Sequence, residues 1–403
     1  MTIDSYDAIV IGAGPAGSHT AYELASSGYR VAVLEQKEAP GIGICCTGIV
    51  SPECFDSFGI TQNVVLTKAN SAKFFAPSGN WVRLRTEKVQ AYVVDRASFD
   101  LAIAAKAKAQ GVDYFCSSRA VSIDIGRGEA RVESLCHGSK EIFEARAVVL
   151  ATGFEPRPSQ RLGLGRITNF AIGAQAEVET RGIDEVEIYF SQQIAQGFFA
   201  WLVPISDVRA LAGVISSSHA KMHLERLLTS LASQGKLITK KAEIRQKTVP
   251  QRILSRTYGD RVLVVGDAAG QVKPTTHGGI YFGHIGAKIA AEVLSQAFAS
   301  DDLTAARLCR YQKQWRAKIG KELSTGYRAR QLYTKLSDRQ IEQIFHVIAS
   351  TRVAESWLES PDFSFDWHSK LILAALKQGL AHRLGKLLHI SELRSDKVEA
   401  QPR

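Results

Sequence analysis

The sequence has few of the features that mark secreted, metal-binding or membrane-spanning proteins. Its 403 residues include only six cysteines, and no two of them form a C-x-x-C pair. Scattered cysteines in a chain of this length argue against a disulfide scaffold or a zinc site and favour a reducing compartment. No window reaches the roughly 18 to 20 apolar residues that a membrane-spanning helix needs, and no cleavable signal pattern opens the chain. We therefore expect a cytoplasmic protein whose membrane contact, where there is one, is peripheral.

Internal repeats, low-complexity tracts and nucleic-acid-binding patterns are also absent from the sequence. The apolar share of 45% is typical of a globular protein with a substantial core, and the length allows two domains. The formal net charge is +10, and the basic residues are spread along the chain. We expect no nucleic-acid partner. Two interpretations of the charge stay open: a solubilising surface, or a face toward anionic lipid or an anionic substrate.

The most informative segment is the first 35 residues. A short apolar run ends at Ile11 and leads directly into G-x-G-x-x-G, and a second apolar run ends at Glu35. This order is typical of a strand, a glycine turn, a helix and a second strand that together bind a dinucleotide. The helix N-terminus holds the pyrophosphate, and the acid accepts from a ribose hydroxyl. We therefore predict a dinucleotide site made of Gly12, Gly14, Pro15, Ala16, Gly17 and Glu35.

Two later motifs narrow the dinucleotide to FAD. Gly266 and Asp267 end an apolar run and are followed by Pro274 and a glycine loop that opens a helix. An acid there suits a ribityl hydroxyl, and the helix N-terminus can stabilise negative charge on a reduced flavin. Arg96, at the start of another expected helix, can also contact the cofactor. Each motif alone is equally an ordinary capped turn or a surface charge, but their order after the fingerprint favours FAD. The remaining expected cofactor residues are Gly153, Gly278, Gly279 and Ile280.

These motifs resemble those of the geranylgeranyl reductase family of FAD-dependent oxidoreductases, within the p-hydroxybenzoate hydroxylase-like class. The matching segments are Gly12 to Glu35, Cys46 to Pro52, Asp95 and Arg96 with Phe99 and Asp100, and Gly266 to Gly283. The resemblance implies an FAD domain and a sheet-and-helix substrate domain, with the flavin at their junction. It also implies a cysteine beside the flavin ring, as a cofactor contact and a candidate proton donor. Cys46 fits the family spacing best, although the adjacent Cys45 leaves the register open.

We predict an α/β fold in which a discontinuous Rossmann-like FAD-binding domain carries an inserted antiparallel-sheet substrate domain and a helical C-terminal region. Short apolar runs at 147–153 and 261–267 indicate parallel strands that are far apart in sequence. Alternating stretches between 174 and 190 indicate half-buried antiparallel strands. The predicted ranges are 1–160 for the first part of the FAD-binding domain, with a substrate-side excursion near 60–92, 161–250 for the substrate domain, 251–300 for the closing part of the FAD-binding domain, and 301–403 for the helical C-terminal region.

The family carries an aromatic motif, P-x-x-Y-x-W-x-F-P, in its substrate domain. The corresponding stretch here is 196–204, which keeps Trp201 and Pro204 and has Phe199 in place of the tyrosine. We predict that these three residues line an apolar substrate pocket. The alternative is that the aromatic side chains only fill the core, as aromatic residues most often do.

His277 stands where family members usually have glycine, in the loop that is expected to face the flavin. An imidazole titrates near neutral pH, so His277 is a candidate proton donor alongside Cys46. The alternative is a neutral histidine that only shapes the turn.

In the segment 370–390 the apolar residues recur with the spacing of an α-helix, so they form one apolar face, and basic residues accompany it. One interpretation is a helix packed on the protein. The other is a helix that lies on an anionic membrane and provides the peripheral contact.

Together these features predict an FAD-dependent reductase of C=C bonds in an isoprenoid or other apolar substrate, with NADPH or NADH as the expected reductant. The flavin delivers hydride to one alkene carbon, and a proton reaches the other. Two alternatives stay open: an FAD-dependent monooxygenase acting on an apolar or aromatic substrate, and a non-catalytic protein that binds flavin and lipid. No second nucleotide fingerprint identifies the reductant, and the sequence leaves the oligomeric state undefined.

Overall fold

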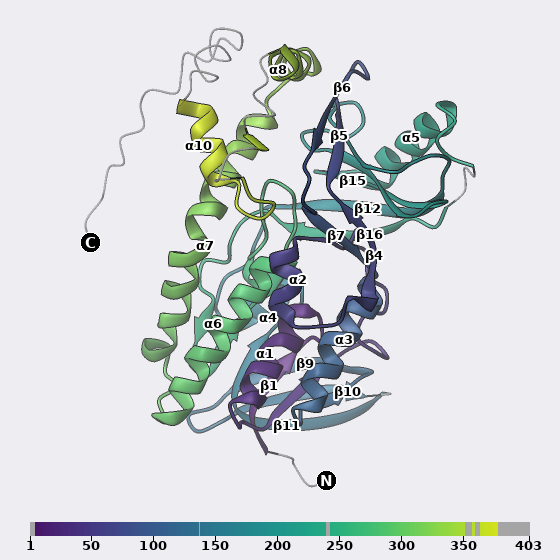
Figure 1. Ribbon diagram of the computed structural model, residues 1–403. Helices are drawn as coiled ribbons and strands as arrows, with labels where there is room; N and C mark the ends of the chain where they lie inside the picture. The colour runs from purple at the N-terminus through teal and green to yellow at the C-terminus, as the bar shows by residue number, and fades with distance from the viewer. Residues whose placement is uncertain (1–4, 137, 239–241, 351–356, 359–362, 378–403) are drawn as a thin grey trace.

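The computed structural model describes residues 5–136, 138–238, 242–350, 357–358 and 363–377. Two large β-sheets and one small sheet make up the strands, and long helices run along one side of the molecule (Figure 1). Among these residues, no helix combines the length and the apolar character needed to cross a bilayer.

The first sheet has eight strands. They are β1 (Ser5–Ile11), β2 (Val31–Leu34), β8 (Asp113–Phe115), β9 (Ser118–Ile125), β10 (Ala130–Cys136), β11 (Ser139–Leu150), β17 (Tyr258–Gly259) and β18 (Val262–Val264). The order is β17-β18-β11-β1-β2-β8, and β10 and β9 extend from β11 as an antiparallel ribbon. β1 pairs in parallel with β2 and β11, and β11 pairs in parallel with β18. Strands from distant parts of the sequence therefore meet in one sheet, which confirms the discontinuous α/β fold.

Both faces of this sheet are buried, which explains why its strands read as continuous apolar runs. Ala8 and Val10 pack in a core with the helices, whereas Ile9 and Ile11 pack in a second core with the β9–β10 ribbon. The helices that contribute to the first core are α1 (Pro15–Ser26), α3 (Arg96–Ala109), α6 (Ile280–Ala299) and α7 (Ala305–Tyr333). Figure 1 shows α7 on the outside of α6, at the edge of the molecule.

The second sheet has seven strands. They are β5 (Ser71–Phe75), β6 (Trp81–Arg85), β12 (Phe170–Glu179), β13 (Val186–Tyr189), β14 (Ala200–Ser206), β15 (Arg209–Ser216) and β16 (Arg245–Pro250). Their order is β16-β12-β15-β14-β13-β5-β6, and every pair is antiparallel except β13–β5. The amphipathic helix α5 (Ala220–Ser233) buries its leucines against one face. The expected excursion near 60–92 therefore supplies the β5–β6 hairpin to the inserted sheet, while the domain ranges themselves remain a prediction.

A small third sheet and several short elements connect these parts. The sheet consists of β3 (Ile49–Val50), β7 (Ala91–Val94) and β4 (Val65–Ala69) in that order. The other elements are α2 (Pro52–Phe58), η1 (Gln62–Val64), α3 (Arg96–Ala109), α4 (Pro156–Arg161), η2 (Gly266–Ala269), α8 (Asp338–Ser350) and α10 (Ser369–Lys377). Of the segment 370–390, only 370–377 lies within the described residues, so the membrane interpretation of its remainder falls outside them.

Two buried histidines lie between α1 and α6. The rings of His19 and His284 are 4.0 Å apart, and Phe58 closes the cluster at 4.4 Å from His284. Burial, together with a smaller effect of His19, lowers the pKa of His284 from its ordinary 6.5 to about 2. The folded protein therefore keeps His284 neutral at any moderately acidic pH.

We expect the free energy of unfolding to fall as the pH drops below about 6.5, because the unfolded chain then binds a proton that folded His284 excludes. For this single group the loss is up to about 1.4 kcal/mol per pH unit. His284→Leu should make the urea midpoint less dependent on pH between about 7 and 5. The matched control is His346→Leu, which changes an exposed histidine on α8. An equal pH dependence in the wild type and His284→Leu would contradict this account.

Candidate active site

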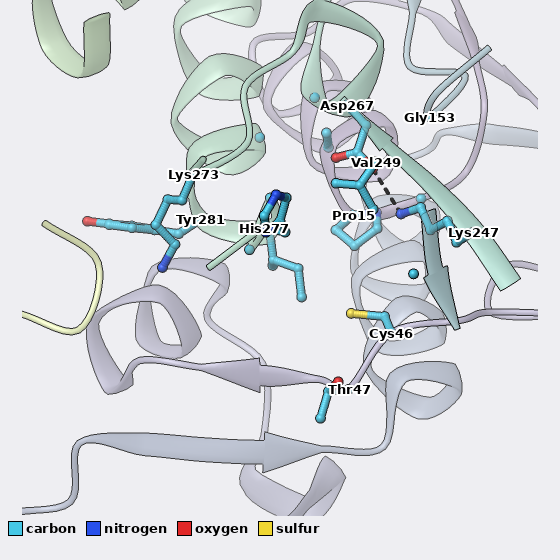
Figure 2. A pocket seen from close by; sticks show the side chains of 18 of the residues that line it. Pro15, Cys46, Thr47, Gly153, Lys247, Val249, Asp267, Lys273, His277 and Tyr281 are labelled. Atoms are coloured by element: carbon cyan, nitrogen blue, oxygen red, sulfur yellow. Dashed lines mark hydrogen bonds and ion pairs between the residues drawn. The ribbon is translucent and has the colours of Figure 1, made fainter. Parts of the chain in front are cut away.

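One cavity of about 1450 Å³ lies where the carboxyl ends of the parallel strands meet the second sheet. Residues from the first sheet and from the second sheet line this cavity, and Figure 2 shows side chains converging on it. The predicted site residues that line it are Gly12, Gly14, Pro15, Ala16, Gly17, Glu35, Cys46, Arg96, Gly153, Phe199, Trp201, Gly266, Asp267, His277, Gly278, Gly279 and Ile280. Pro204 and Pro274 are buried and do not line the cavity.

The three glycines of the fingerprint have different surroundings. A Cβ on Gly12 would lie 2.4 Å from the carbonyl oxygen of Ala151, and one on Gly17 would lie 2.0 Å from the carbonyl oxygen of Gly12. Gly12 also has a φ of 107°, which side chains strongly disfavour. A Cβ on Gly14 would meet nothing within 4 Å. Gly12 and Gly17 are therefore required by packing within the chain, whereas the space beside Gly14 belongs to the cavity.

Donors for an anionic ligand gather at this end of the cavity. Helix α1 begins at Pro15 and no side chain caps its first turn, so its free N–H groups are available to a phosphate. The Glu35 carboxylate accepts the backbone N–H of Ala13 at 2.8 Å and that of Lys37 at 2.9 Å. These two bonds hold the Glu35 carboxylate at the cavity wall with acceptor capacity to spare.

Arg96 is a largely buried cation in the wall of the cavity. Its guanidinium donates to the Asp100 carboxylate at 2.8 Å. Burial lowers the pKa of Arg96, but the Asp100 carboxylate and the Cys46 sulfur outweigh that effect and raise it overall. Arg96 Nε is buried and has no hydrogen-bond partner among the described residues. A buried donor without a partner is rare in proteins, and here it marks a place where a ligand oxygen fits.

Asp267 forms an ion pair that the sequence did not predict. The ammonium of Lys247, on β16 of the second sheet, donates to Asp267 at 2.9 Å, and Figure 2 shows this pair at the edge of the cavity. The Asp267 carboxylate raises the pKa of Lys247, and partial desolvation opposes this effect less strongly. Lys247 belongs to no motif and becomes a site residue only because β16 pairs with β12 beside the flavin-binding loop. The pair thus joins the two sheets electrostatically.

The cysteine segment lies on the opposite wall. The Cys46 sulfur points into the cavity in Figure 2, and the hydroxyl of the next residue, Thr47, donates to Gln175 of β12 at 2.8 Å. Cys45 also lines the cavity and directs its sulfur toward the Arg245 carbonyl at 3.5 Å. Burial, and then the neighbouring Cys46, raises the pKa of Cys45 to about 11. Both sulfurs are free thiols.

His277 lies in the loop before α6 with a left-handed backbone, φ 58°. Its ring is 5.4 Å from that of Phe198 and 6.3 Å from that of Phe199, and both ring nitrogens are buried without a hydrogen-bond partner among the described residues. Burial, and then the nearby Arg330 guanidinium, lowers the pKa of His277 well below 6.5. A pKa lowered in this way disfavours the protonated imidazolium that the sequence led us to expect near neutral pH. The left-handed backbone explains why a glycine is also suited to this position.

Trp201 lies flat on the second sheet. It is paired across β14 and β15 with Gly213, where a Cβ would lie only 2.2 Å from the indole ring, so the glycine makes room for it. Phe199 lies beside it with ring centres 5.9 Å apart. Pro204, three residues after Trp201, faces the other side of the strand because side chains alternate, and its carbonyl accepts from Thr67 at 3.0 Å. The aromatic pair thus forms the wall, and the proline belongs to the strand beneath it.

The segment before α10 closes the cavity on the substrate side, which the sequence did not indicate. Phe363 and Phe365 line the cavity. The buried Asp366 carboxylate pairs with Lys273 at 2.5 Å and accepts from the Ser51 hydroxyl. The C-terminal segment is thereby tied to the loop that carries His277.

Comparisons with known proteins agree with this geometry. A family model described as pyridine nucleotide-disulphide oxidoreductase matches residues 6–194. An uncharacterised protein of Methanocaldococcus jannaschii is 29% identical, covering 95% of this chain and 99% of that protein. Digeranylgeranylglycerophospholipid reductase 2 of Methanothermobacter thermautotrophicus is 31% identical over 354 residues, which cover 84% of this chain and 90% of that protein. The chain belongs to the geranylgeranyl reductase family of FAD-dependent oxidoreductases.

Solved structures show the same fold. A geranylgeranyl bacteriochlorophyll reductase-like protein of Thermoplasma acidophilum aligns with a TM-score of 0.84 at 21% identity, covering 96% of this chain and 99% of that one. The p-nitrophenol 4-monooxygenase of Pseudomonas putida aligns with a TM-score of 0.67 at 17% identity, covering 88% of this chain and 97% of that one. At these identities the likeness concerns the fold alone, and a fold of this kind hosts several chemistries.

FAD is the cofactor of this reductase family member, and the cavity fits it. The open space at Gly14 accepts a pyrophosphate, and the uncapped first turn of α1 supplies N–H donors. The unpartnered Arg96 Nε supplies a further donor to a cofactor oxygen. We assign these contacts to FAD as a prediction, together with Glu35 for the ribose and Asp267 for the ribityl chain.

Gly14→Val should abolish FAD binding while leaving the fold intact. The valine side chain has room within the chain but would occupy the space of the pyrophosphate. The measurement is the yellow absorbance of the purified protein, together with the FAD released on denaturation and the urea midpoint of the apoprotein. Gly128→Val, at another glycine whose Cβ would meet nothing within 4 Å, is the control. Normal FAD content in Gly14→Val would refute the assignment.

Proposed function

We propose that this family member reduces C=C bonds in the isoprenoid chains of a lipid or another apolar substrate. The observation that carries the proposal is that the FAD site and an apolar chamber form one continuous cavity. The chamber's walls include aromatic and aliphatic side chains of the second sheet and of the C-terminal segment, among them Phe74, Ile188, Trp201 and Phe365. A relative named digeranylgeranylglycerophospholipid reductase supports the substrate class.

In this reaction the chain's own residues hold the substrate, exclude water and keep the chamber in shape. Bound FAD, once reduced, supplies the hydride. Trp201 and Phe199 hold the substrate chain, and they exclude water so that the hydride reaches the alkene and not the solvent. The ion pair between Lys273 and Asp366 holds the C-terminal wall in place. A protein group or a bound water then gives the proton to the second alkene carbon, and His277 and Cys46 are the candidates that line the chamber.

The direct test is a single turnover without oxygen. Protein reduced with dithionite is mixed with digeranylgeranylglycerophospholipid in detergent micelles, and the lipid is analysed by mass spectrometry. We expect the flavin absorbance to return as the lipid gains two hydrogens for each C=C bond reduced. p-Hydroxybenzoate serves as the aromatic comparison. An unchanged lipid, combined with hydroxylated p-hydroxybenzoate under air, would establish the monooxygenase alternative instead.

Trp201→Ala should slow the reoxidation of reduced flavin by the substrate about tenfold, equivalent to ~1.4 kcal/mol of lost transition-state stabilisation. Reduction of the flavin by dithionite should be unchanged, because Trp201 lies in the substrate wall. Stopped-flow absorbance measures both half-reactions. Trp81→Ala, at a tryptophan that is 52% exposed on β6, is the matched control. Equal rates in all three proteins would leave Trp201 as a structural residue only.

His277 should not impose a pH dependence on substrate reduction between about pH 7 and 9. Its pKa is lowered well below 6.5, so the imidazolium is already lost before pH 7 is reached. His277→Gly should therefore keep FAD and run parallel to the wild type across this range, whereas Cys46→Ala should be slower if the thiol is the donor. A wild-type rate that falls with a midpoint near neutral pH, and a flat profile in His277→Gly, would identify the imidazolium as the acid.

A further inference from the structure

Arg330, near the C-terminal end of α7, is a buried cation without an acidic partner. The residue is 5% exposed, and it forms no ion pair with any residue that the structure describes. Its Nε also lacks a hydrogen-bond partner among these residues. Burial lowers the pKa of Arg330 to about 10, so the guanidinium is still charged at neutral pH. A buried charge without an opposite charge is costly, and an uncharged side chain of similar length would avoid this cost.

The guanidinium contacts the turn that precedes β14. Its central carbon lies 3.4 Å from the centre of the Phe198 ring, and one of its nitrogens donates to the backbone carbonyl of Gly197. Tyr333, three residues further along α7, donates its hydroxyl to the Phe198 carbonyl at 2.8 Å. Gly197 has a φ of 70°, and a Cβ there would lie 3.3 Å from the Thr334 side chain. The end of α7 therefore fits closely against this turn.

The turn, residues 195–198, leads directly into the aromatic wall of the cavity. Phe199 follows it, and Trp201 lies two residues further, in β14. Within the turn, the N–H of Phe198 donates to the Ala195 carbonyl at 2.7 Å. Because both aromatic residues of the wall continue the chain from this turn, a shift of the turn would move their side chains.

The same side of α7 packs on the loop that carries His277. A Cβ on Gly326 would lie 3.3 Å from the Pro274 side chain, and Arg330 lies one helical turn further on the same face of the helix. The Phe198 ring, which the Arg330 guanidinium covers, lies 5.4 Å from the His277 ring. Arg330 is therefore placed where the turn before the aromatic wall meets the loop of His277.

We propose that Arg330 is a positioning residue for substrate reduction, which holds Phe199 and Trp201 at a fixed distance from the loop of His277. This role rests on the proposed function, because it concerns how the substrate chain is presented to the cofactor. Arginine suits the task, since its planar group can stack on an aromatic ring and donate hydrogen bonds at the same time. Methionine would keep the length of the side chain but lose the donor and the charge. Lysine would keep a donor and the charge but lose the planar stack.

The first measurement concerns the turn alone, in the FAD-loaded protein without substrate. Hydrogen–deuterium exchange with mass spectrometry follows the amides of residues 195–198 in the wild type, Arg330→Met and Arg330→Lys. Arg328→Met, at an exposed cation of the same helix, is the matched control. In Arg330→Met we expect exchange in the turn to be at least about tenfold faster, with a smaller increase in Arg330→Lys and none in Arg328→Met. Peptides from β1 and α6 should exchange equally in all four proteins.

The second measurement is the single turnover with digeranylgeranylglycerophospholipid in detergent micelles, at increasing lipid concentrations. A misplaced aromatic wall should lower the limiting rate of flavin reoxidation more than it changes the lipid concentration that gives half of that rate, because orientation acts on the chemical step. We expect the limiting rate to fall about tenfold in Arg330→Met, to recover in part in Arg330→Lys and to be unchanged in Arg328→Met. Dithionite should reduce all four proteins equally, which establishes that FAD is bound.

Three results would overturn the proposal. Exchange in the turn could be the same in Arg330→Met and the wild type, so that the guanidinium does not hold the turn. Exchange in the turn could increase while the limiting rate stays the same, so that the reaction does not depend on this contact. Exchange could increase throughout Arg330→Met, β1 and α6 included, which would make Arg330 a residue of general stability. If Arg330→Met fails to fold, Arg330→Lys replaces it, and exchange and rate equal to those of the wild type would then overturn the proposal.

The two measurements also separate this role from the proposed function. A wild type that leaves the lipid unchanged would contradict the reduction of C=C bonds. Exchange in the turn is measured without any lipid, so it would still decide whether Arg330 holds the aromatic wall in place.

Discussion

The structure depends on the close approach of chain segments at the carboxyl edge of the parallel sheet. The end of β1, the start of α1, the end of β11 and the turn after β18 meet there with almost no side chains between them. A Cβ on Gly12 or Gly17 would lie within 2.4 Å of a backbone carbonyl oxygen, and one on Gly266 would lie 3.0 Å from the Ala16 side chain. Dense packing of this kind tolerates no added methyl group without a shift of the backbone. It places the N-terminus of α1 and the carboxylate of Asp267 on one side of the cavity.

The second sheet and the C-terminal segment are joined to this edge by a few polar contacts. Lys247 bonds Asp267, Thr47 bonds Gln175, and Lys273 bonds Asp366. Among these contacts, Lys273 and Asp366 form a buried ion pair. Such a pair adds little to stability as a pair, but losing one partner leaves an unpaired buried charge that costs about 3 to 5 kcal/mol. These contacts therefore fix the position of the second sheet and of the C-terminal segment more than they stabilise the fold. Each lies at the cavity wall, so the chamber has its shape only when the two sheets and the C-terminal segment are together.

The distribution of charge also depends on how the elements pack in the folded chain. Along the sequence the basic residues are evenly spread, and the excess of +10 points to no particular surface. In the folded chain, acids such as Asp100 and Glu185 are paired with Arg96 and Arg83. On α7 the only acid, Glu322, is turned inward to cap α10. The exposed charged residues of α7 are therefore all cations.

The sequence by itself determined the FAD-binding half of the molecule. The structure confirms the strand, turn and helix around Gly12, the discontinuous parallel strands and the helix after Gly279. Each of these elements was predictable because the spacing of its apolar residues, glycines and acids is a local feature of the sequence. The alternation of apolar and polar residues also predicted the antiparallel strands of the inserted sheet. Trp201 and Phe199 were identified as candidates from a local motif, and they do line the cavity.

Only the tertiary structure decided the rest of the site. Lys247, Lys273 and Asp366 belong to no motif, and they meet their partners through contacts between segments that are distant in the sequence. The lowered pKa of His277 follows from its burial and from Arg330, which lies 53 residues further along the chain. Pro204 was placed in the pocket by its motif, whereas strand alternation turns it away. Local patterns specify backbone elements, but burial, charge pairing and the facing of side chains depend on which elements finally pack together.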